Sequence, residues 1–411
     1  MITIYLGMIT DRIPVLPAIS RSHHVFPTND IWLGDIFDLG ELAEKIRHPI
    51  LEWPSVKKID SLQVETLGCW SHWLLLGDSQ TRNTNVPNDL RLDLSYTSVP
   101  EWAKLEQSSH ILQIWSLATL GFHEGHSRGV SGNQPLASPL NGAIEPPDQH
   151  LLCLDSLYFT GFVYNIDSFD SGHAPVWRAV AQYARFLPSV NRLAKTYIRR
   201  AFGLAETDEI PQFIAIHIRR SDFADWCRPP DIIEDCLPQL DAFVLRVKEV
   251  EAELQSRDKG IQLPMRVLVT SDEPYTVDRA GHDGVVTKVA NPYWQKISDL
   301  GWNYVNHDAE QTVVKHGAYV ILPTLFPDNF YAVVHRAIGI SRYFRHQAND
   351  LCAVTFRYLP LIIDQAVHSL AIGFVGTDLS TMSRMGALRV ETWNGGITRK
   401  VMWGNKKADI H

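Results

Sequence analysis

The sequence has little of several features that would assign a protein to a common class at once. Its 411 residues include five cysteines, at positions 69, 153, 227, 236 and 352, and no pair of them has zinc-finger spacing. Neither a Walker phosphate loop nor a G-x-G-x-x-G fingerprint occurs, which disfavours an ATPase or a dinucleotide-dependent enzyme. An Asn-x-Ser/Thr sequence for N-glycosylation is also absent.

The sequence also has no excess of positively charged residues. Lys and Arg number 38 against 46 Asp and Glu, which gives a net charge of −8, so we expect no nucleic-acid partner. The apolar opening segment meets Asp11 and Arg12 too early to span a bilayer or to act as a signal peptide. We therefore expect no membrane contact from this chain, and any phosphate ligand needs a local basic pocket.

The composition is that of an ordinary globular protein, with 45% hydrophobic and 20% charged residues. The length suffices for two or three domains with sizeable cores. Cys227 and Cys236 flank a Pro-Pro turn and could close a small disulfide loop in an oxidising compartment. Because the number of cysteines is odd, at least one thiol stays free.

Helix and strand patterns alternate over residues 210–390, which predicts a parallel α/β sheet. The expected helices cover residues 39–45, 177–202 with a kink at Pro188, 242–256 and 361–370, and the expected strands cover 213–218, 265–270 and 371–375. The sequence Ser271-Asp272-Glu273-Pro274 predicts a helix start directly after the second of these strands. Residues 122–149 lack periodicity and predict a long loop.

One strand ends in a cluster of charges. The run Phe213-Ile214-Ala215-Ile216-His217-Ile218 is typical of a strand buried on both faces, and Arg219, Arg220 and Asp222 follow it directly. In open α/β sheets, ligands bind outside the carboxyl ends of the strands. Two guanidinium groups at such a place suit a phosphate. The alternative, which the spacing leaves equally open, is an Arg pair that forms ion pairs with Asp222 or Asp225.

A second cluster follows a later strand. Phe374-Val375-Gly376-Thr377 is followed by Ser380-Thr381-Met382-Ser383, which is typical of a strand, a glycine turn and a helix start rich in hydroxyls. Unpaired N–H groups at a helix N-terminus, together with Ser and Thr hydroxyls, can hold phosphate oxygens without a metal. Taken alone, the pattern is more typical of ordinary helix capping. Paired with the arginine cluster in the same sheet, it favours a diphosphate site.

These residues, taken in order, resemble a known family. The motif His217-x-Arg219-Arg220-x-Asp222-Phe223, then Thr270-Ser271-Asp272-Glu273, then Asp364 and the segment 374–383 are similar to motifs of the GDP-fucose protein O-fucosyltransferases, especially their divergent fungal branch. The resemblance extends from about Gly34 to Gly404 and is strongest over 213–227 and 361–383. The two motifs together are fairly specific, whereas either alone is weak.

The resemblance implies an α/β fold of the GT-B type, with two Rossmann-like lobes and mainly parallel sheets. We expect an N-terminal, acceptor-side lobe over residues 1–174 and a C-terminal lobe that binds the GDP-sugar over residues 175–411. The implied reaction is an inverting transfer of fucose from GDP-fucose to a hydroxyl acceptor, on a protein Ser/Thr or a glycan. It needs no cofactor and no metal.

The resemblance also implies roles for single residues. Arg219 is the catalytic residue and neutralises the β-phosphate as GDP leaves. His217 and Arg220 support it, and Asp222 orients the arginines. Asp364 recognises guanine by accepting hydrogen bonds from the base. The other substrate-binding positions lie in the second cluster and are Gly376, Thr377, Ser380, Thr381 and Ser383.

The sequence departs from the family in two places. The family's first strand and Gly-rich, Asn-containing loop have no counterpart after Met1, so we expect the lobe to be truncated at its start and to lack any membrane anchor. About forty residues, 318–357, are inserted before the helix that contains Asp364. A misplaced start and an intron read through as protein are the hypotheses for these departures. The family implies the ER or Golgi lumen as the compartment.

Two other functions stay open at this point. A non-catalytic relative that binds GDP or a glycan is favoured by the missing loop, because Glu124 and Asp225 are the only general-base candidates we identify. A glycosyltransferase with another nucleotide sugar is the second alternative, and Asp364 argues against it because a carboxylate suits guanine and not uracil. His123, Glu124 and His126 lack the context of a metal site.

Overall fold

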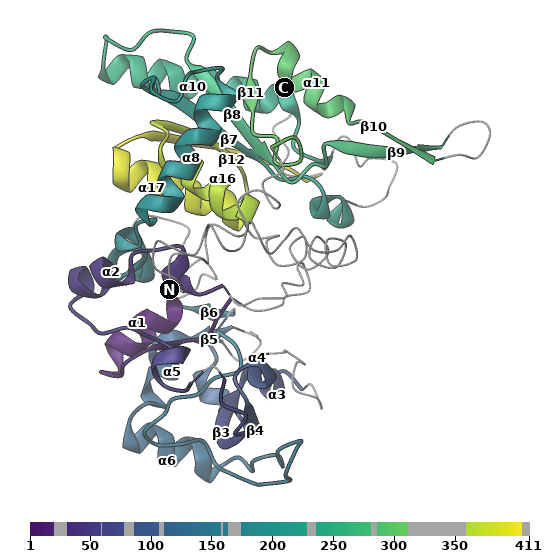
Figure 1. The fold of residues 1–411 in the computed structure, drawn as a ribbon. Coiled ribbons are helices and arrows are strands. Elements are labelled where there is room, and N and C mark those ends of the chain that lie inside the picture. The colour runs from purple at the N-terminus through teal and green to yellow at the C-terminus, as the bar shows by residue number, and fades with distance from the viewer. Residues whose placement is uncertain are drawn as a thin grey trace, which may run out of the picture. The chain divides into compact units, whose positions relative to one another are not determined.

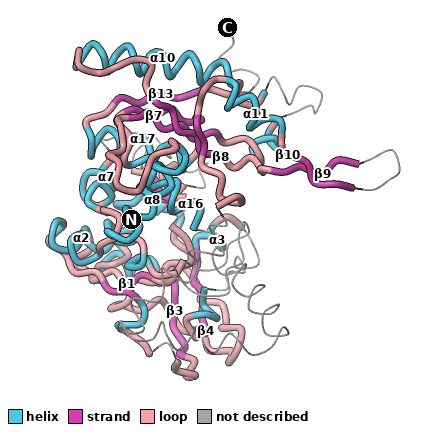
Figure 2. The backbone as a smooth tube through the Cα atoms, turned by 45° about the horizontal axis from the view of Figure 1, so that its top comes forward, coloured by secondary structure: helices cyan, strands magenta, loops and turns pink. Residues whose placement is uncertain are grey.

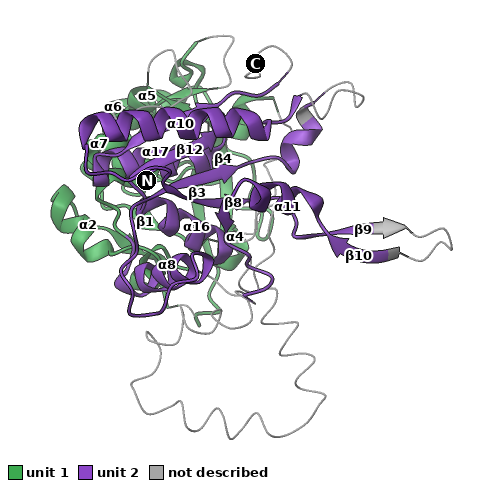
Figure 3. Ribbon diagram, turned by 90° about the horizontal axis from the view of Figure 1, so that it is seen from above, with its two compact units in different colours: residues 1–185 green, residues 186–411 purple. Residues whose placement is uncertain are grey.

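The computed structural model divides the chain into two compact units, residues 1–185 (unit 1) and 186–411 (unit 2) (Figure 3). The division falls somewhat later than the predicted boundary after residue 174. The structure describes residues 1–19, 31–58, 60–77, 86–106, 111–157, 159–162, 174–227, 236–280, 286–310 and 359–404. The insertion predicted at 318–357 lies outside these residues.

Unit 1 combines short helices with three pairs of parallel strands. Its α-helices are α1 (Ile2–Ile9), α2 (Leu39–Ile46), α3 (His72–Leu75), α4 (Val86–Asp89), α5 (Ile114–Thr119), α6 (His123–Ser131) and α7 (Pro175–Ala179). Its 3-10 helices are η1 (Leu33–Asp35), η2 (Trp53–Ser55), η3 (Glu101–Ala103) and η4 (Ala181–Tyr183). Its strands are β1 (Val15–Leu16), β2 (Leu51–Glu52), β3 (Glu65–Ser71), β4 (Leu92–Ser98), β5 (Leu112–Gln113) and β6 (Thr160–Gly161). They pair in parallel as β1·β2, β3·β4 and β5·β6.

Helix α6 contradicts the prediction of a loop over 122–149. His126 and Gly129 are the buried residues of this helix, and Val130 is its one large apolar residue, so the sequence shows no run of apolar residues at helical spacing. A Cβ atom at Gly129 would lie 2.7 Å from the Trp70 ring, which shows how closely α6 packs on the core. Residues 133–150 contain no helix or strand.

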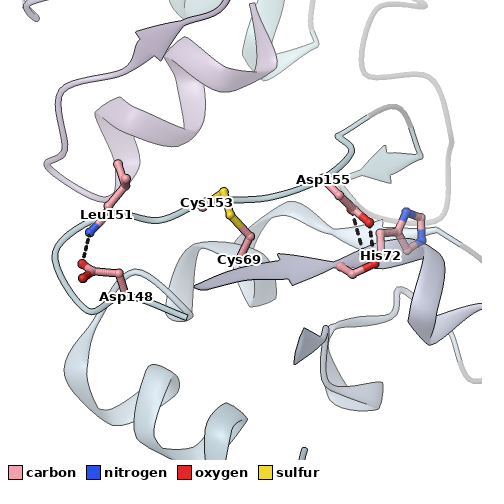
Figure 4. Close-up of a disulfide and its surroundings, with 7 residues drawn as sticks. Cys69, His72, Asp148, Leu151, Cys153 and Asp155 are labelled. Atoms are coloured by element: carbon pink, nitrogen blue, oxygen red, sulfur yellow. Dashed lines mark hydrogen bonds between the residues drawn. A yellow bond between two sulfur atoms is a disulfide. The ribbon is translucent and has the colours of Figure 1, made fainter. Parts of the chain in front are cut away.

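A disulfide joins β3 to the segment before β6 (Figure 4). It links Cys69, which is fully buried, to Cys153, 84 residues away in the sequence. Next to the bridge, the Asp155 carboxylate accepts hydrogen bonds from the Ser71 hydroxyl and from the backbone N–H of His72 at 2.8 Å. Burial raises the pKa of Asp155, and these hydrogen bonds oppose the rise. Asp155 therefore accepts hydrogen bonds at the start of α3, whose N-cap is Ser71.

Unit 2 is built on a five-stranded parallel sheet with the order β11-β8-β7-β12-β13. Its strands are β7 (Phe213–Ile218), β8 (Arg266–Ser271), β9 (Thr276–Ala280), β10 (Val286–Ala290), β11 (Asn303–Tyr304), β12 (Gly373–Thr377) and β13 (Ile397–Val401). Its helices are α8 (Pro188–Ala201), η5 (Asp222–Trp226), α10 (Leu240–Arg257), α11 (Pro292–Asp299), α16 (Leu359–Ser369) and α17 (Thr381–Asn394). The predicted strands 213–218, 265–270 and 371–375 correspond to β7, β8 and β12.

Side-chain alternation along β7 divides the core of unit 2 into two layers. Ile214, Ile216 and Ile218 share a hydrophobic cluster with α10, through residues such as Phe243 and Val250. Phe213, Ala215 and His217 lie on the other face of β7. The helices α8, α16 and α17 lie close to one another in Figure 1. All six residues of β7 are buried, as expected for a strand covered on both sides.

Two predictions about helices in this region are wrong. The helix expected over 177–202 is instead α7, η4 and α8, and Pro188 is the first residue of α8. The residue before a proline is pushed toward the extended conformation, and Leu187 accordingly has a ψ of 149°. After β8, the sequence Ser271–Pro274 leads into the antiparallel hairpin β9·β10 (Figure 2) and not into a helix. The next helix, α11, begins at Pro292 with Asn291 as its cap.

The disulfide predicted between Cys227 and Cys236 is present and joins residues nine positions apart. Cys352 lies outside the described residues. None of the helices described is both long and apolar enough to cross a membrane.

Candidate functional site

Charged and hydroxyl residues gather where the parallel strands of unit 2 end. Arg219 and Arg220 follow β7, Asp272 and Glu273 follow β8, and the turn at 377–380 follows β12. Strand neighbours in the sheet bring these segments together, because β7 pairs with both β8 and β12. The structure therefore unites the two clusters that the sequence separates by about 150 residues.

Two carboxylates hold Arg219. Its Nη2 donates to Asp222 Oδ2 at 2.7 Å, and its Nε lies 3.2 Å from Asp272 Oδ2. Nη1 has no partner among the residues that the structure describes, and the side chain keeps 24% of its surface exposed. A guanidinium held in this way presents its remaining N–H donors in a fixed orientation. The structure thus places Asp222 in contact with Arg219, and the orienting role expected for Asp222 stays a prediction.

Arg220 has different surroundings. Its Nε donates to Glu273 Oε1 at 2.9 Å and its Nη1 to the carbonyl of Pro238 at 2.9 Å. The guanidinium carbon also lies 4.7 Å from the centre of the Tyr293 ring. Through Nε and Nη1, and with its side chain 14% exposed, Arg220 ties the end of β7 to neighbouring elements.

Two buried hydrogen bonds at the strand ends of the sheet involve histidines. His217 Nδ1 hydrogen-bonds with Ser383 Oγ at 2.8 Å, and Thr270 Oγ1 hydrogen-bonds with His368 Nε2 at 2.7 Å. The two imidazole rings meet edge to face, with centroids 5.6 Å apart. Ser383 lies in the first turn of α17, so the first of these hydrogen bonds joins β7 to that helix.

Burial disfavours the charged form of both histidines. Burial lowers the pKa of His217 to about 4, with Asp364 opposing the shift and Arg219 adding to it. Burial also lowers the pKa of His368, and the neighbouring His217 and Arg389 add to the effect. His217 is 2% exposed, so its imidazole is shielded from solvent, and its supporting role stays a prediction.

The turn between β12 and α17 contains the predicted glycine and hydroxyl residues. Thr377 is buried, accepts a hydrogen bond from the backbone N–H of Arg219 at 2.9 Å and donates to the His217 carbonyl, so it joins β12 to the end of β7. Ser380 is the N-cap of α17 and accepts from the backbone N–H of Ser383. Thr381, the first residue of α17, is exposed. Gly376 packs directly on Ser383.

Asp364 lies on the second turn of α16 and is 5% exposed. Its Oδ1 hydrogen-bonds with His307 Nε2 at 2.8 Å. His307 follows β11 at the same edge of the sheet, and nothing in the sequence pointed to it. A two-residue strand has no recognisable period, and His307 and Asp364 are 57 residues apart.

The remaining predicted polar residues do not form a second site. Glu124 is exposed on α6, and Asp225 is exposed in η5. His126, in contrast, is buried and hydrogen-bonds with the Pro147 carbonyl at 2.7 Å. Within the described ranges, no group of three or more His, Cys, Asp or Glu residues has the arrangement of a metal site.

The fold is mixed α/β with mainly parallel sheets, as predicted, and it matches the GT-B-like fold of solved structures. One of these is the crystal structure of POFUT1 in complex with GDP-fucose, with a TM-score of 0.50 at 12% identity, covering 98% of this chain and 92% of that one. Another is POFUT1 in complex with GDP, with a TM-score of 0.50 at 13% identity and coverages of 97% and 92%. No protein-family model matches the sequence, and a search of curated proteins finds no match.

Proposed function

We propose that the chain is a glycosyltransferase that binds GDP-fucose in unit 2 and transfers fucose to a hydroxyl acceptor, with inversion and without a metal. The observation that supports this most is the arrangement of Arg219. Its guanidinium is held between Asp222 and Asp272, and its Nη1 is unpaired among the described residues. It lies at the carboxyl end of β7, where ligands of open α/β sheets bind.

The proposed chemistry follows from the charges that the reaction creates. Breaking the bond between sugar and phosphate leaves positive charge on the sugar and negative charge on GDP. Arg219 stabilises the leaving phosphate, and the N–H groups at the start of α17 and the Thr381 hydroxyl bind its oxygens. Arg220, His217, Thr377 and Ser383 hold these groups in place through the contacts described above. The fold shared with POFUT1, solved with GDP-fucose and with GDP, supports the choice of donor.

Calorimetric titration with GDP, UDP and ADP tests the donor. We expect GDP to bind and the other two nucleotides to bind at least about tenfold more weakly, because Asp364 accepts from the guanine edge. A preference for UDP would overturn the choice of GDP and leave only the fold.

Substitution of Arg219 tests the phosphate site. Arg219→Ala removes a charge-assisted contact and should weaken GDP binding by about 10- to 100-fold, while the protein stays folded with a somewhat lower Tm because Asp222 and Asp272 lose their partner. Arg257→Ala is the matched control, because Arg257 is exposed at the end of α10, at the opposite edge of the sheet from Arg219. Unchanged GDP affinity in Arg219→Ala would remove the central assignment.

Transfer itself needs a separate assay, because both general-base candidates are exposed and neither has a side-chain hydrogen bond within the part of the chain that the structure describes. Incubation with GDP-fucose and a panel of glycan and Ser/Thr peptide acceptors should release GDP in the presence of the right acceptor. Tight GDP binding without any transfer would favour the non-catalytic alternative.

The two disulfides support maturation in an oxidising compartment, for which we propose the ER or Golgi lumen. Thiol labelling of the protein taken from its native cells should leave the cysteines at 69, 153, 227 and 236 unmodified until a reductant is added. Labelling of these four without reductant would exclude that compartment.

A further inference from the structure

His307 and Asp364 form a pair at the carboxyl edge of the unit 2 sheet. The distance between His307 Nε2 and Asp364 Oδ1 is 2.8 Å, and the two side chains are only 10% and 7% exposed. A carboxylate accepts hydrogen bonds and cannot donate them, so Nε2 of His307 carries the proton. The pair comes from two separate elements, the loop after β11 and helix α16.

Other aromatic residues hold His307 in place. The ring of Tyr197, on α8, lies 5.6 Å from the imidazole at an angle of 38°. Tyr275 donates its hydroxyl to the Val305 carbonyl at 2.5 Å, two residues before His307, and stacks on Trp294 at 4.7 Å. The loop that carries His307 is therefore anchored on both sides, and the imidazole has little freedom to leave Asp364.

The hydrogen bond to Oδ1 fixes the rotation of the Asp364 carboxylate about its terminal torsion, which is otherwise broad. Each carboxylate oxygen has two lone pairs, so Oδ1 can accept from His307 and from a ligand at once. Oδ2 has no hydrogen-bond partner among the described residues. Guanine presents two adjacent donors, N1–H and the 2-amino group, and only a carboxylate in the right plane accepts from both.

We propose that His307 is a positioning residue that makes Asp364 selective for guanine, and in particular for its 2-amino group. The inference rests on the proposed binding of a guanine nucleotide in unit 2. It adds a specificity-determining residue that acts through Asp364 and does not contact the reacting atoms.

The test compares GDP with inosine diphosphate, which lacks the 2-amino group, by calorimetric titration. In the unmodified protein, we expect GDP to bind about tenfold more tightly than inosine diphosphate. In His307→Phe, which keeps a ring against Tyr197 but has no donor, the ratio should fall to about one to two. His307→Gln, whose amide nitrogen can replace Nε2 as the donor, should restore most of the ratio.

The outcomes separate this inference from the function on which it rests. A purely structural role for His307 predicts that His307→Phe weakens both nucleotides equally, and an unchanged ratio in this variant would overturn the inference while GDP binding stands. Equal affinities in the unmodified protein would likewise overturn it and leave the phosphate site intact. If the unmodified protein binds neither nucleotide, the proposed function fails, and the inference fails with it.

Discussion

At the scale of single residues, a buried histidine makes stability depend on pH. His217 has a folded pKa of about 4, whereas an unperturbed histidine titrates at 6.5. Between these values the unfolded chain binds more protons than the folded one, so acid favours unfolding. The contribution of His217 to the free energy of unfolding is complete above pH 6.5 and is lost as the pH falls toward 4. The free energy lost over this range is roughly 3 kcal/mol.

We expect His217→Asn to reduce this pH dependence. Asn does not titrate, and its side chain can replace Nδ1 in the contact with Ser383. Urea unfolding at pH 7 and pH 5 should show a loss of free energy of unfolding that is roughly 2 kcal/mol smaller in the variant than in the unmodified protein. Equal losses in the two proteins would show that His217 titrates normally in the fold.

Residue types alone located part of the candidate site. Arg219 and Asp222 were recognised because charges directly after a buried strand are unusual, and the structure places them in contact. His307 was not recognisable, because its partner Asp364 is remote in the sequence. The different surroundings of Arg219 and Arg220 were also hidden, since Glu273 and Tyr293, which contact Arg220, are remote from it in the sequence.

At the scale of elements, the contact between β12 and α17 depends on a glycine. A Cβ atom at Gly376 would lie 2.5 Å from Ser383 Cβ and 2.7 Å from the Phe374 ring. Both neighbours are buried, so neither can move freely away. The absence of a side chain at 376 thus lets the first turn of α17 approach the strand end closely.

Gly376→Ala should separate β12 from α17. We expect a loss of about 1–3 kcal/mol in the free energy of unfolding, as for other overpacked cores, and weaker GDP binding because the start of α17 shifts. Gly132→Ala is the control, since a Cβ there would meet nothing within 4 Å and φ is −102°. Denaturant unfolding and GDP titration measure both effects. A Gly376→Ala protein as stable as the control would show that the contact is looser than described.

Elements differ in how well the sequence predicted them, for physical reasons. β7 was predictable as a continuous run of apolar residues, and α10 because apolar residues such as Val247, Val250 and Leu254 recur at helical spacing. α6 buries His126 and Gly129, so the spacing of its apolar residues did not indicate a helix. α8 was merged with α7 because the pattern continues across Pro188, although the proline starts a new helix.

At the scale of the whole molecule, the two disulfides lie in different units and close loops of different length. Cys69 and Cys153 are 84 residues apart in unit 1, whereas Cys227 and Cys236 are nine apart in unit 2. The disulfide that closes the short loop was predictable because its cysteines are close in the sequence. The disulfide that closes the long loop was not. The longer loop restricts the unfolded chain more, by about 4.5 kcal/mol against about 2.5 kcal/mol in the chain-entropy account.

Reduction should therefore destabilise unit 1 more than unit 2. We expect the double variant Cys69→Ala, Cys153→Ala to lower the Tm of one calorimetric transition strongly, because it removes both the restriction of the unfolded chain and a fully buried contact on β3. The matched variant Cys227→Ala, Cys236→Ala should lower the other transition by less. GDP identifies the transition of unit 2, because a ligand raises the Tm of the unit that binds it. The assignment of nucleotide binding to unit 2 would be wrong if GDP instead raised the transition that loss of the Cys69–Cys153 bridge lowers.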